Sequence, residues 1–199
     1  FEAAMAEQKE RARAARAKVS AKVATPDTTK LDAKELTTED KDGETKLLLL
    51  GQDGKEIVSA ADGTEVTVVL KNNPFHAEGG GQIGDSGTIV GEEGTIQVED
   101  TKKLPDGIVY VIGTVSEGII REGETVTVTV DRVRREDIAR NHTGTHMLQA
   151  ALRRVLGDQG NQAGSIALPD RLRFALTWPE PLSEKELAAV EQLANEEIL

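Results

Sequence analysis

The sequence contains no cysteine, only three histidines and few aromatic side chains. The absence of cysteine excludes a disulfide scaffold, a thiol nucleophile and a cysteine-ligated metal within these 199 residues. Aromatic residues make up 3% of the chain, so valine, isoleucine, leucine and alanine must supply any hydrophobic core. No apolar run approaches the roughly 18 residues of a membrane span, and no signal-peptide pattern opens the chain. We therefore expect no membrane partner.

The formal net charge of the whole chain is −11, and its acidic excess lies mostly in one segment. Residues 26–130 contain 21 acidic and 9 basic side chains, whereas residues 1–22 contain six basic and three acidic ones. Residues 131–173 contain eight arginines against five acids. Overall acidity disfavours a general nucleic-acid coat, but the two basic segments remain places where a polyanion can bind.

Residues 45–130 have the pattern of an antiparallel β-domain. Short segments rich in valine, isoleucine and threonine alternate with glycine-containing turns, which indicates a barrel or a sandwich. The Asp53-Gly54 and Glu93-Gly94 pairs favour tight hairpins. The expected strands are 46–50, 56–59, 65–70, 87–90, 95–99, 108–115 and 125–131.

Helical patterns flank this β-domain. The alanine-rich residues 1–22 predict a surface helix, and residues 132–157 predict a long helix that ends at Gly157. Ser183 and Glu186 form the capping box of a last helix over 183–199. The other expectations are a linker or short helix around 32–36, and a loop that starts at 160 and leads into a strand over 171–176.

Residues 142–146 form the first candidate site. His142 and His146 lie four residues apart, so in a helix both imidazoles share one face and can bind one metal ion. Two histidines leave such a site incomplete, because catalytic zinc usually has three protein ligands and a water. The motif lacks the glutamate of the H-E-x-x-H protease helix. The alternative is a structural pair that packs or caps near a basic helix.

Two polar segments are further candidates. Residues 73–87 hold five glycines within nine residues, which requires glycine-specific conformations and brings Gln82 and Asp85 near a partner group. No Walker lysine follows, and a tight connection between strands is the alternative. Downstream, Gln162 and Ser165 are neutral hydrogen-bonding residues suited to holding a small polar group or a water.

Taken in their order along the chain, the three motifs resemble those of the alanyl-tRNA synthetases. The resemblance covers nearly the whole chain and rests on residues 1–13, 73–85, 140–146, 162–165 and 172–174. His76 stands where the family commonly has tyrosine, and Ala175 where it commonly has aspartate. The second departure affects local hydrogen bonding after Phe174.

The resemblance implies an α+β fold: an N-terminal helix, an antiparallel β-barrel and a truncated α+β editing domain. It assigns residues 1–24 to the helix ending the tRNA-recognition region, 25–131 to the barrel and 132–199 to the first part of the editing domain. The chain does not open with methionine, and it stops inside a helical pattern. We therefore expect an internal fragment, of open oligomeric state.

The resemblance also implies a cytoplasmic enzyme that joins alanine to tRNA(Ala) with ATP and Mg²⁺, in a domain outside this chain. Its editing domain hydrolyses tRNA(Ala) mischarged with serine or glycine, because an alanine pocket rejects these neighbours only modestly by binding. The partner is the acceptor end of tRNA(Ala), towards which the arginines of 131–173 are expected to lie.

Site residues carry over one by one. The family holds zinc by a His-x-x-x-His pair, matched by His142 and His146, and by a later Cys-x-x-x-His pair that this chain lacks. Thr145, Gln162 and Ser165 match positions lining the editing pocket. The hypothesis is that Thr145 and Gln162 position the aminoacyl ester or the attacking water. With half its zinc ligands, the chain is expected to bind zinc weakly and to lack deacylase activity.

Two other interpretations stay open. Editing hydrolases related to threonyl-tRNA synthetases share the histidine half-site, although the barrel and the first helix argue against them. A non-catalytic β-barrel that docks tRNA or another domain is the alternative from a different class. A zinc titration separates them, since a docking module is indifferent to zinc.

Overall fold

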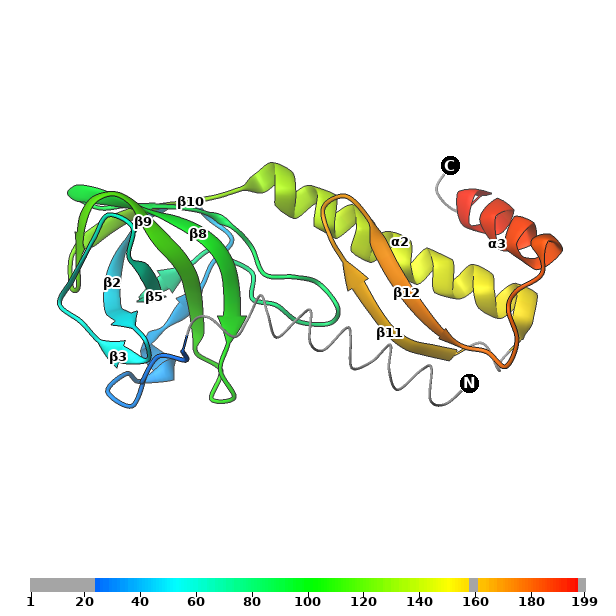
Figure 1. The fold of residues 1–199 in the computed structure, drawn as a ribbon, viewed down its shortest axis with the longest axis horizontal. Coiled ribbons are helices and arrows are strands. Elements are labelled where there is room, and N and C mark those ends of the chain that lie inside the picture. Colours follow the sequence, from blue (N-terminus) through cyan, green and yellow to red (C-terminus); the bar gives the residue numbers. More distant parts are fainter. Residues whose placement is uncertain (1–23, 158–160, 197–199) are drawn as a thin grey trace.

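The computed structural model describes residues 24–157 and 161–196. A β-barrel stands at one end, and an arm of helix and hairpin extends from it (Figure 1). The predicted helix over 1–22 lies outside the described residues. No helix among the described residues is long and apolar enough to cross a membrane.

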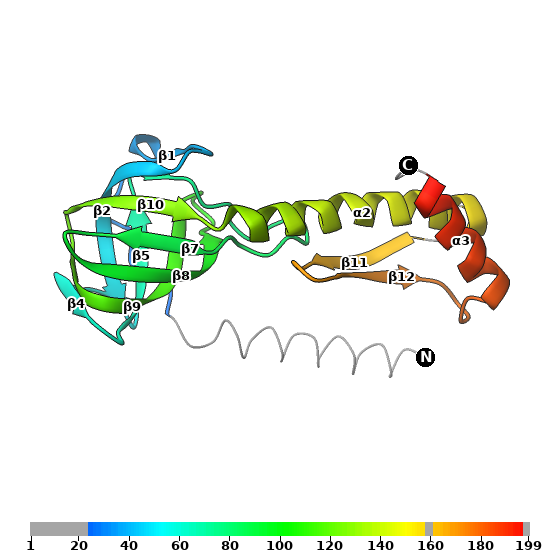
Figure 2. The same ribbon diagram turned by 90° about the horizontal axis from the view of Figure 1, so that it is seen from above.

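Six antiparallel strands close the barrel, in the order β10-β7-β8-β9-β5-β2, with β2 pairing back onto β10 (Figure 2). Short strands lie around it: β3 pairs with β2, β4 with β9, and β1 with β6. The bounds are β1 Thr37–Thr38, β2 Gly43–Gln52, β3 Lys55–Glu56, β4 Ser59–Ala61, β5 Glu65–Leu70, β6 Asn72–Asn73, β7 Gly87–Val90, β8 Glu93–Lys103, β9 Val109–Arg121 and β10 Thr125–Val130.

Alternation of side chains along the strands builds the barrel core. In β10, Val126, Val128 and Val130 are buried while the intervening threonines are exposed. Aliphatic side chains from all six strands fill the interior, together with Phe75 from the segment after β6. The predicted α+β class with an antiparallel barrel is thus confirmed.

Two local predictions for the barrel need correction. The segment 56–59 is not one strand, because Lys55–Glu56 pairs with β2 and Ser59–Ala61 pairs with β9. The hairpin at Asp53-Gly54 forms with φ of 52° and 77°, as expected. Gly94, however, lies inside β8, where a Cβ would stand 2.7 Å from the backbone of Ile119. The absence of a side chain at Gly94 lets β8 and β9 approach each other closely.

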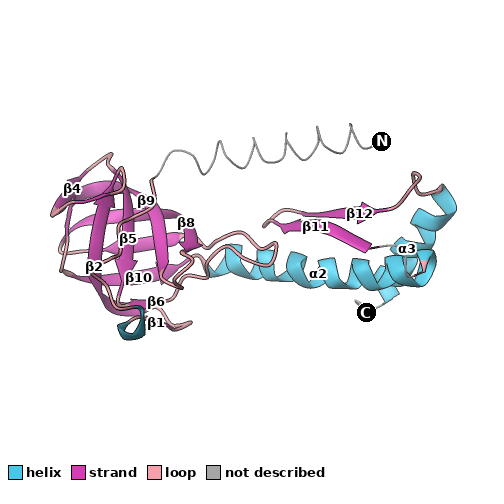
Figure 3. Cartoon of the chain, turned by 90° about the horizontal axis from the view of Figure 1, so that it is seen from below, coloured by secondary structure: helices cyan, strands magenta, loops and turns pink. Residues whose placement is uncertain are grey.

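The arm consists of α2 (Arg132–Leu156), β11 (Asn161–Ala167), β12 (Leu172–Thr177) and α3 (Glu184–Glu196) (Figure 3). Asp131 caps α2 by accepting from the backbone N–H of Arg134, and Gly157 ends it, as predicted. Strands β11 and β12 form an antiparallel hairpin beside α2. Side chains of α2, α3 and β12 share a small core around Leu152 and Val190.

The predicted loop from 160 is wrong over Asn161–Ala167, which forms β11. Its polar residues and glycine conceal a strand whose stability comes from pairing with β12. The short helix around 32–36 is the 3₁₀ turn η1 (Ala33–Glu35), capped by Asp32. The capping box is formed as predicted, since the Ser183 backbone N–H and hydroxyl both donate to Glu186.

Candidate functional site

A buried ion pair joins α2 to the barrel. The Asp85 side chain is 1% exposed, and its Oδ2 accepts from the backbone N–H of His76 at 2.6 Å and from Arg135 Nε at 2.8 Å. Arg135 also donates to the carbonyl of Pro74. Asp85 Oδ1 has no hydrogen-bond partner among the described residues. The positive charge that compensates the buried carboxylate comes from Arg135, which pairs with Oδ2.

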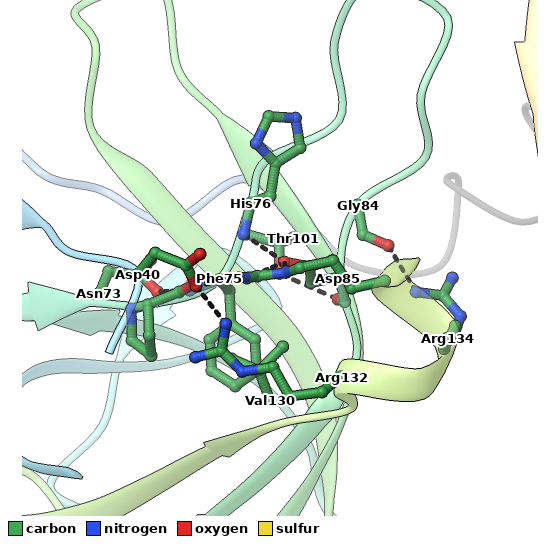
Figure 4. Close-up of polar contacts among 12 residues, drawn as sticks. Asp40, Asn73, Phe75, His76, Gly84, Asp85, Thr101, Val130, Arg132 and Arg134 are labelled. Atoms are coloured by element: carbon green, nitrogen blue, oxygen red, sulfur yellow. Dashed lines mark hydrogen bonds and ion pairs between the residues drawn. The ribbon is translucent and has the colours of Figure 1, made fainter. Parts of the chain in front are cut away.

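Two further arginines of the same helical turn reinforce this junction (Figure 4). Arg132 donates to Asp42 at 2.8 Å and also pairs with Asp40, while Arg134 donates to the carbonyl of Gly84 at 2.9 Å. Hydrogen bonding from Arg132 lowers the pKa of Asp40, and bonding to Asp42 raises the pKa of Arg132. These contacts fix the direction in which α2 leaves the barrel.

The expectation that the arginines of 131–173 lie towards a tRNA end stays a prediction. In the first turn of α2, Arg132, Arg134 and Arg135 are bonded to the barrel. Sequence reasoning missed this role because their partners stand 50 to 95 residues away along the chain. Arg153 and Arg173 are exposed further along the arm.

The glycine-rich loop, residues 74–86 between β6 and β7, connects the two strands tightly and also contacts the arm. Gly80 and Gly81 have φ of 59° and 86°, as a glycine-specific conformation requires. A Cβ on Gly81 would stand 2.8 Å from the carbonyl oxygen of Ser165. The Gly81 carbonyl accepts from the backbone N–H of Ala167 at 2.8 Å. The loop therefore rests on β11.

The first departure from the family pattern is accommodated by this loop. The imidazole of His76 is exposed, and Figure 4 shows it pointing away from the ion pairs. Its bond to Asp85 uses the backbone N–H, which any residue other than proline supplies. Ala175 pairs with Gly164 in the hairpin, where a backbone ladder needs no aspartate side chain.

His142 and His146 stand together on α2, with ring centroids 5.2 Å apart and ring planes at 32°. Two imidazoles binding one tetrahedral zinc through Zn–N bonds of about 2.0–2.1 Å have ring centres about 5.2 Å apart. The spacing therefore fits a shared metal ion. The part of the chain that the structure describes groups no third histidine, cysteine or carboxylate with them, so the pair is half a site.

The expected pocket residues lie on the two elements that face each other. Thr145 is buried on α2, and its hydroxyl donates to the Asn141 carbonyl at 2.9 Å. On β11, Gln162 Nε2 donates to Ser165 Oγ at 2.8 Å. The structure packs α2, which carries the histidine motif, against β11, which carries Gln162 and Ser165.

Asn141 lies within the 140–146 motif but is not among the predicted site residues. Its Nδ2 donates to the carbonyls of Leu168 at 2.7 Å and Pro169 at 3.2 Å, in the turn between β11 and β12. This contact ties the hairpin to α2 one residue before His142. Its position directly before the histidine motif was the available signal.

Comparison with known proteins assigns the chain to a family. The alanine–tRNA ligase of Chloroflexus aurantiacus is 48% identical over 198 residues, which are 98% of this chain and 22% of that protein. That of Chelativorans sp. strain BNC1 is 44% identical over 161 residues, which are 81% of this chain and 18% of that protein. The chain thus spans about a fifth of the length of these relatives, and the resemblance to alanyl-tRNA synthetases is confirmed. The family model for class II tRNA synthetases (A) matches residues 1–134, so the chain belongs to the class II (A) tRNA synthetases.

Proposed function

We propose that the arm is the first part of an aminoacyl-tRNA editing site within a cytoplasmic alanine–tRNA ligase. The observation that carries this proposal is the His142–His146 pair, spaced for one metal ion on the helix that packs against β11. The whole ligase would join alanine to tRNA(Ala) with ATP and Mg²⁺. Its editing site would hydrolyse tRNA(Ala) mischarged with serine or glycine.

In this proposal His142 and His146 are two ligands of a zinc ion, and the remaining ligands come from outside the described residues. Zinc supplies positive charge and Lewis acidity when it is bound. Because two imidazoles are half a ligand set, this chain alone should bind zinc weakly.

The hydrogen-bonding states of the other residues define what they can do. The Thr145 hydroxyl donates within α2 and its side chain is buried, so its oxygen would accept only from a group that enters the arm. Gln162 donates to Ser165, which leaves the Gln162 carbonyl as an acceptor and the Ser165 hydroxyl as a donor. These groups would orient the aminoacyl ester and the water that attacks it.

The hydrolysis needs no reactant other than the ester and one water molecule. The water oxygen bonds to the ester carbonyl carbon, the bond to the ribose oxygen breaks, and a water proton ends on that ribose oxygen. The tRNA and the free amino acid are the products. A second hydrolytic site is useful because a pocket separates side chains that differ by one small group only modestly.

A chimera tests the editing proposal. This chain would replace the matching 198 residues of the Chloroflexus aurantiacus ligase, and the deacylation of seryl-tRNA(Ala) would be followed. We expect hydrolysis by the chimera, its loss in the His142→Ala and His146→Ala variants, and none by the chain alone. The matched control is His76→Ala, because that histidine is exposed on the barrel loop. Zinc-dependent hydrolysis by the isolated chain would contradict the half-site.

The described residues also favour a second candidate function, because they offer two metal ligands and no third. A barrel with a helical arm that docks tRNA or another domain needs no metal. Titration of the chain with Zn²⁺, followed by calorimetry, separates the two functions. Binding that is lost in His142→Ala supports the editing site, whereas indifference to zinc supports the docking module.

A further inference from the structure

The glycine-rich loop carries a side chain from the barrel to the metal half-site. Figure 1 shows the loop between β6 and β7 extending from the barrel towards the β11–β12 hairpin. Gln82 forms a parallel backbone bridge with Ala167 of β11. Its side-chain Oε1 lies 3.1 Å from Nδ1 of His142 on α2. One residue of the loop between β6 and β7 therefore contacts both α2 and β11.

The backbone around Gln82 holds this side chain in place. Gly79 and Gln82 exchange two backbone hydrogen bonds, of 3.0 and 2.9 Å, across a turn made by Gly80 and Gly81. The turn is seated on β11 by the bond from Ala167 to Gly81. Because the turn is closed by its own backbone bonds and is held on β11, the backbone of Gln82 is fixed where its side chain meets His142.

The geometry of this contact bears on the tautomer of the neutral His142 imidazole. An amide oxygen only accepts hydrogen bonds, so the bond to Gln82 requires a proton on Nδ1 of the imidazole. In the neutral ring, Nε2 then carries the lone pair. A metal ligand needs that lone pair, and ligating histidines generally donate their other ring N–H to an oxygen that fixes the tautomer and the ring orientation.

We propose that Gln82 is a positioning residue for metal binding, which holds His142 in the Nδ1–H tautomer with Nε2 available as a ligand. The metal half-site is then built jointly by the barrel and the arm. This inference rests on the proposed zinc site, and it adds a residue that itself binds no metal.

The first measurement reads the tautomer without metal. Nitrogen-15 NMR of the imidazoles in the metal-free chain, at a pH well above the ordinary histidine pKa, distinguishes Nδ1–H from Nε2–H. We expect Nδ1–H at His142, loss of that preference in Gln82→Leu, and its retention in Gln82→Glu, whose carboxylate still accepts. Gln52→Leu, at an exposed end of β2, is the matched control. An Nε2–H tautomer in the wild-type chain would overturn the proposal.

The second measurement is the affinity for Zn²⁺ alone, by competition with a chromophoric chelator. Removal of such a partner typically weakens metal binding about 10–100-fold, so we expect that loss in Gln82→Leu and recovery in Gln82→Glu. Equal affinities of wild type and Gln82→Leu would overturn the role of Gln82. Absence of zinc binding by the wild-type chain would refute the proposed metal site instead, and the tautomer measurement would still decide the contact.

Discussion

The Arg135 guanidinium and the Asp85 carboxylate meet at the point where α2 leaves the barrel. They stand 50 residues apart along the chain, and the Asp85 side chain is almost wholly buried. Asp85 also accepts from the backbone N–H of His76 and so organises the start of the glycine-rich loop. This ion pair thus joins the helix and the loop that bear the candidate site.

Replacement of Arg135 by methionine should destabilise the chain by about 3–5 kcal/mol, because it leaves a buried carboxylate without its counter-charge. Urea unfolding monitored by circular dichroism measures this loss. Arg134→Met is the matched control, since the Arg134 guanidinium donates to the backbone carbonyl of Gly84 rather than to a buried carboxylate, and its loss should cost less. Adding Asp85→Asn to Arg135→Met should recover part of the stability. Equal losses for the two arginine variants would contradict the buried pair.

Gly81→Ala should loosen the contact between the loop and β11. The new Cβ would stand 2.8 Å from the Ser165 carbonyl oxygen, in a backbone conformation with φ of 86°. Gly80→Ala carries a similar conformational penalty, about 1–2 kcal/mol, but its Cβ meets nothing within 4 Å. Amide hydrogen exchange at Ala167, which donates to Gly81, should quicken in Gly81→Ala and much less in Gly80→Ala. The same exchange rate in both variants would argue against the contact.

The stability of the barrel should depend on pH through Asp100. Burial raises the pKa of this carboxyl, although Lys102 opposes the shift. The favourable contribution of the protonated form is therefore complete below the unfolded pKa, and it is lost as the pH rises through the folded pKa. Burial disfavours the charged form, so Asp100→Asn should raise the melting temperature at pH values above the raised pKa of Asp100.

That gain should shrink towards zero as the pH falls through the raised pKa of Asp100 towards 3.8, its ordinary value. Melting curves at a series of pH values measure it. Asp62→Asn, in an exposed turn, removes the same charge and corrects for the altered net charge. A gain that persists undiminished in acid would show that burial of the charge is not its cause.

Ser183→Ala should weaken the start of α3 by about 0.5–2 kcal/mol, the usual value of a helix N-cap. Ser183 bonds both ways with Glu186, and this bonding lowers the pKa of the Glu186 carboxyl. Glu186→Gln keeps an acceptor for the Ser183 N–H and should lose less. Hydrogen exchange of the first amides of α3 reports the difference, and unchanged exchange in Ser183→Ala would contradict the capping box.

Features set by neighbouring residues could be predicted from the sequence. The alternation in β10, the end of α2 at Gly157 and the capping box at Ser183 each depend on residues within a few positions of one another. The histidine spacing on α2 is equally local, because four residues make about one helical turn. The strand β11 was missed because its stability depends on pairing with β12 rather than on its own composition.

The sequence by itself determined the antiparallel β-domain, the long helix and the presence of two candidate metal ligands, since periodicity and turn chemistry are local properties of a chain. Only the tertiary structure decided what these elements do together. It placed Asp85 under Arg135 and Gln82 against His142, which are 50 and 60 residues apart. Such pairs depend on barrel closure and on the path of the glycine-rich loop, and neither is written in the spacing of nearby residues.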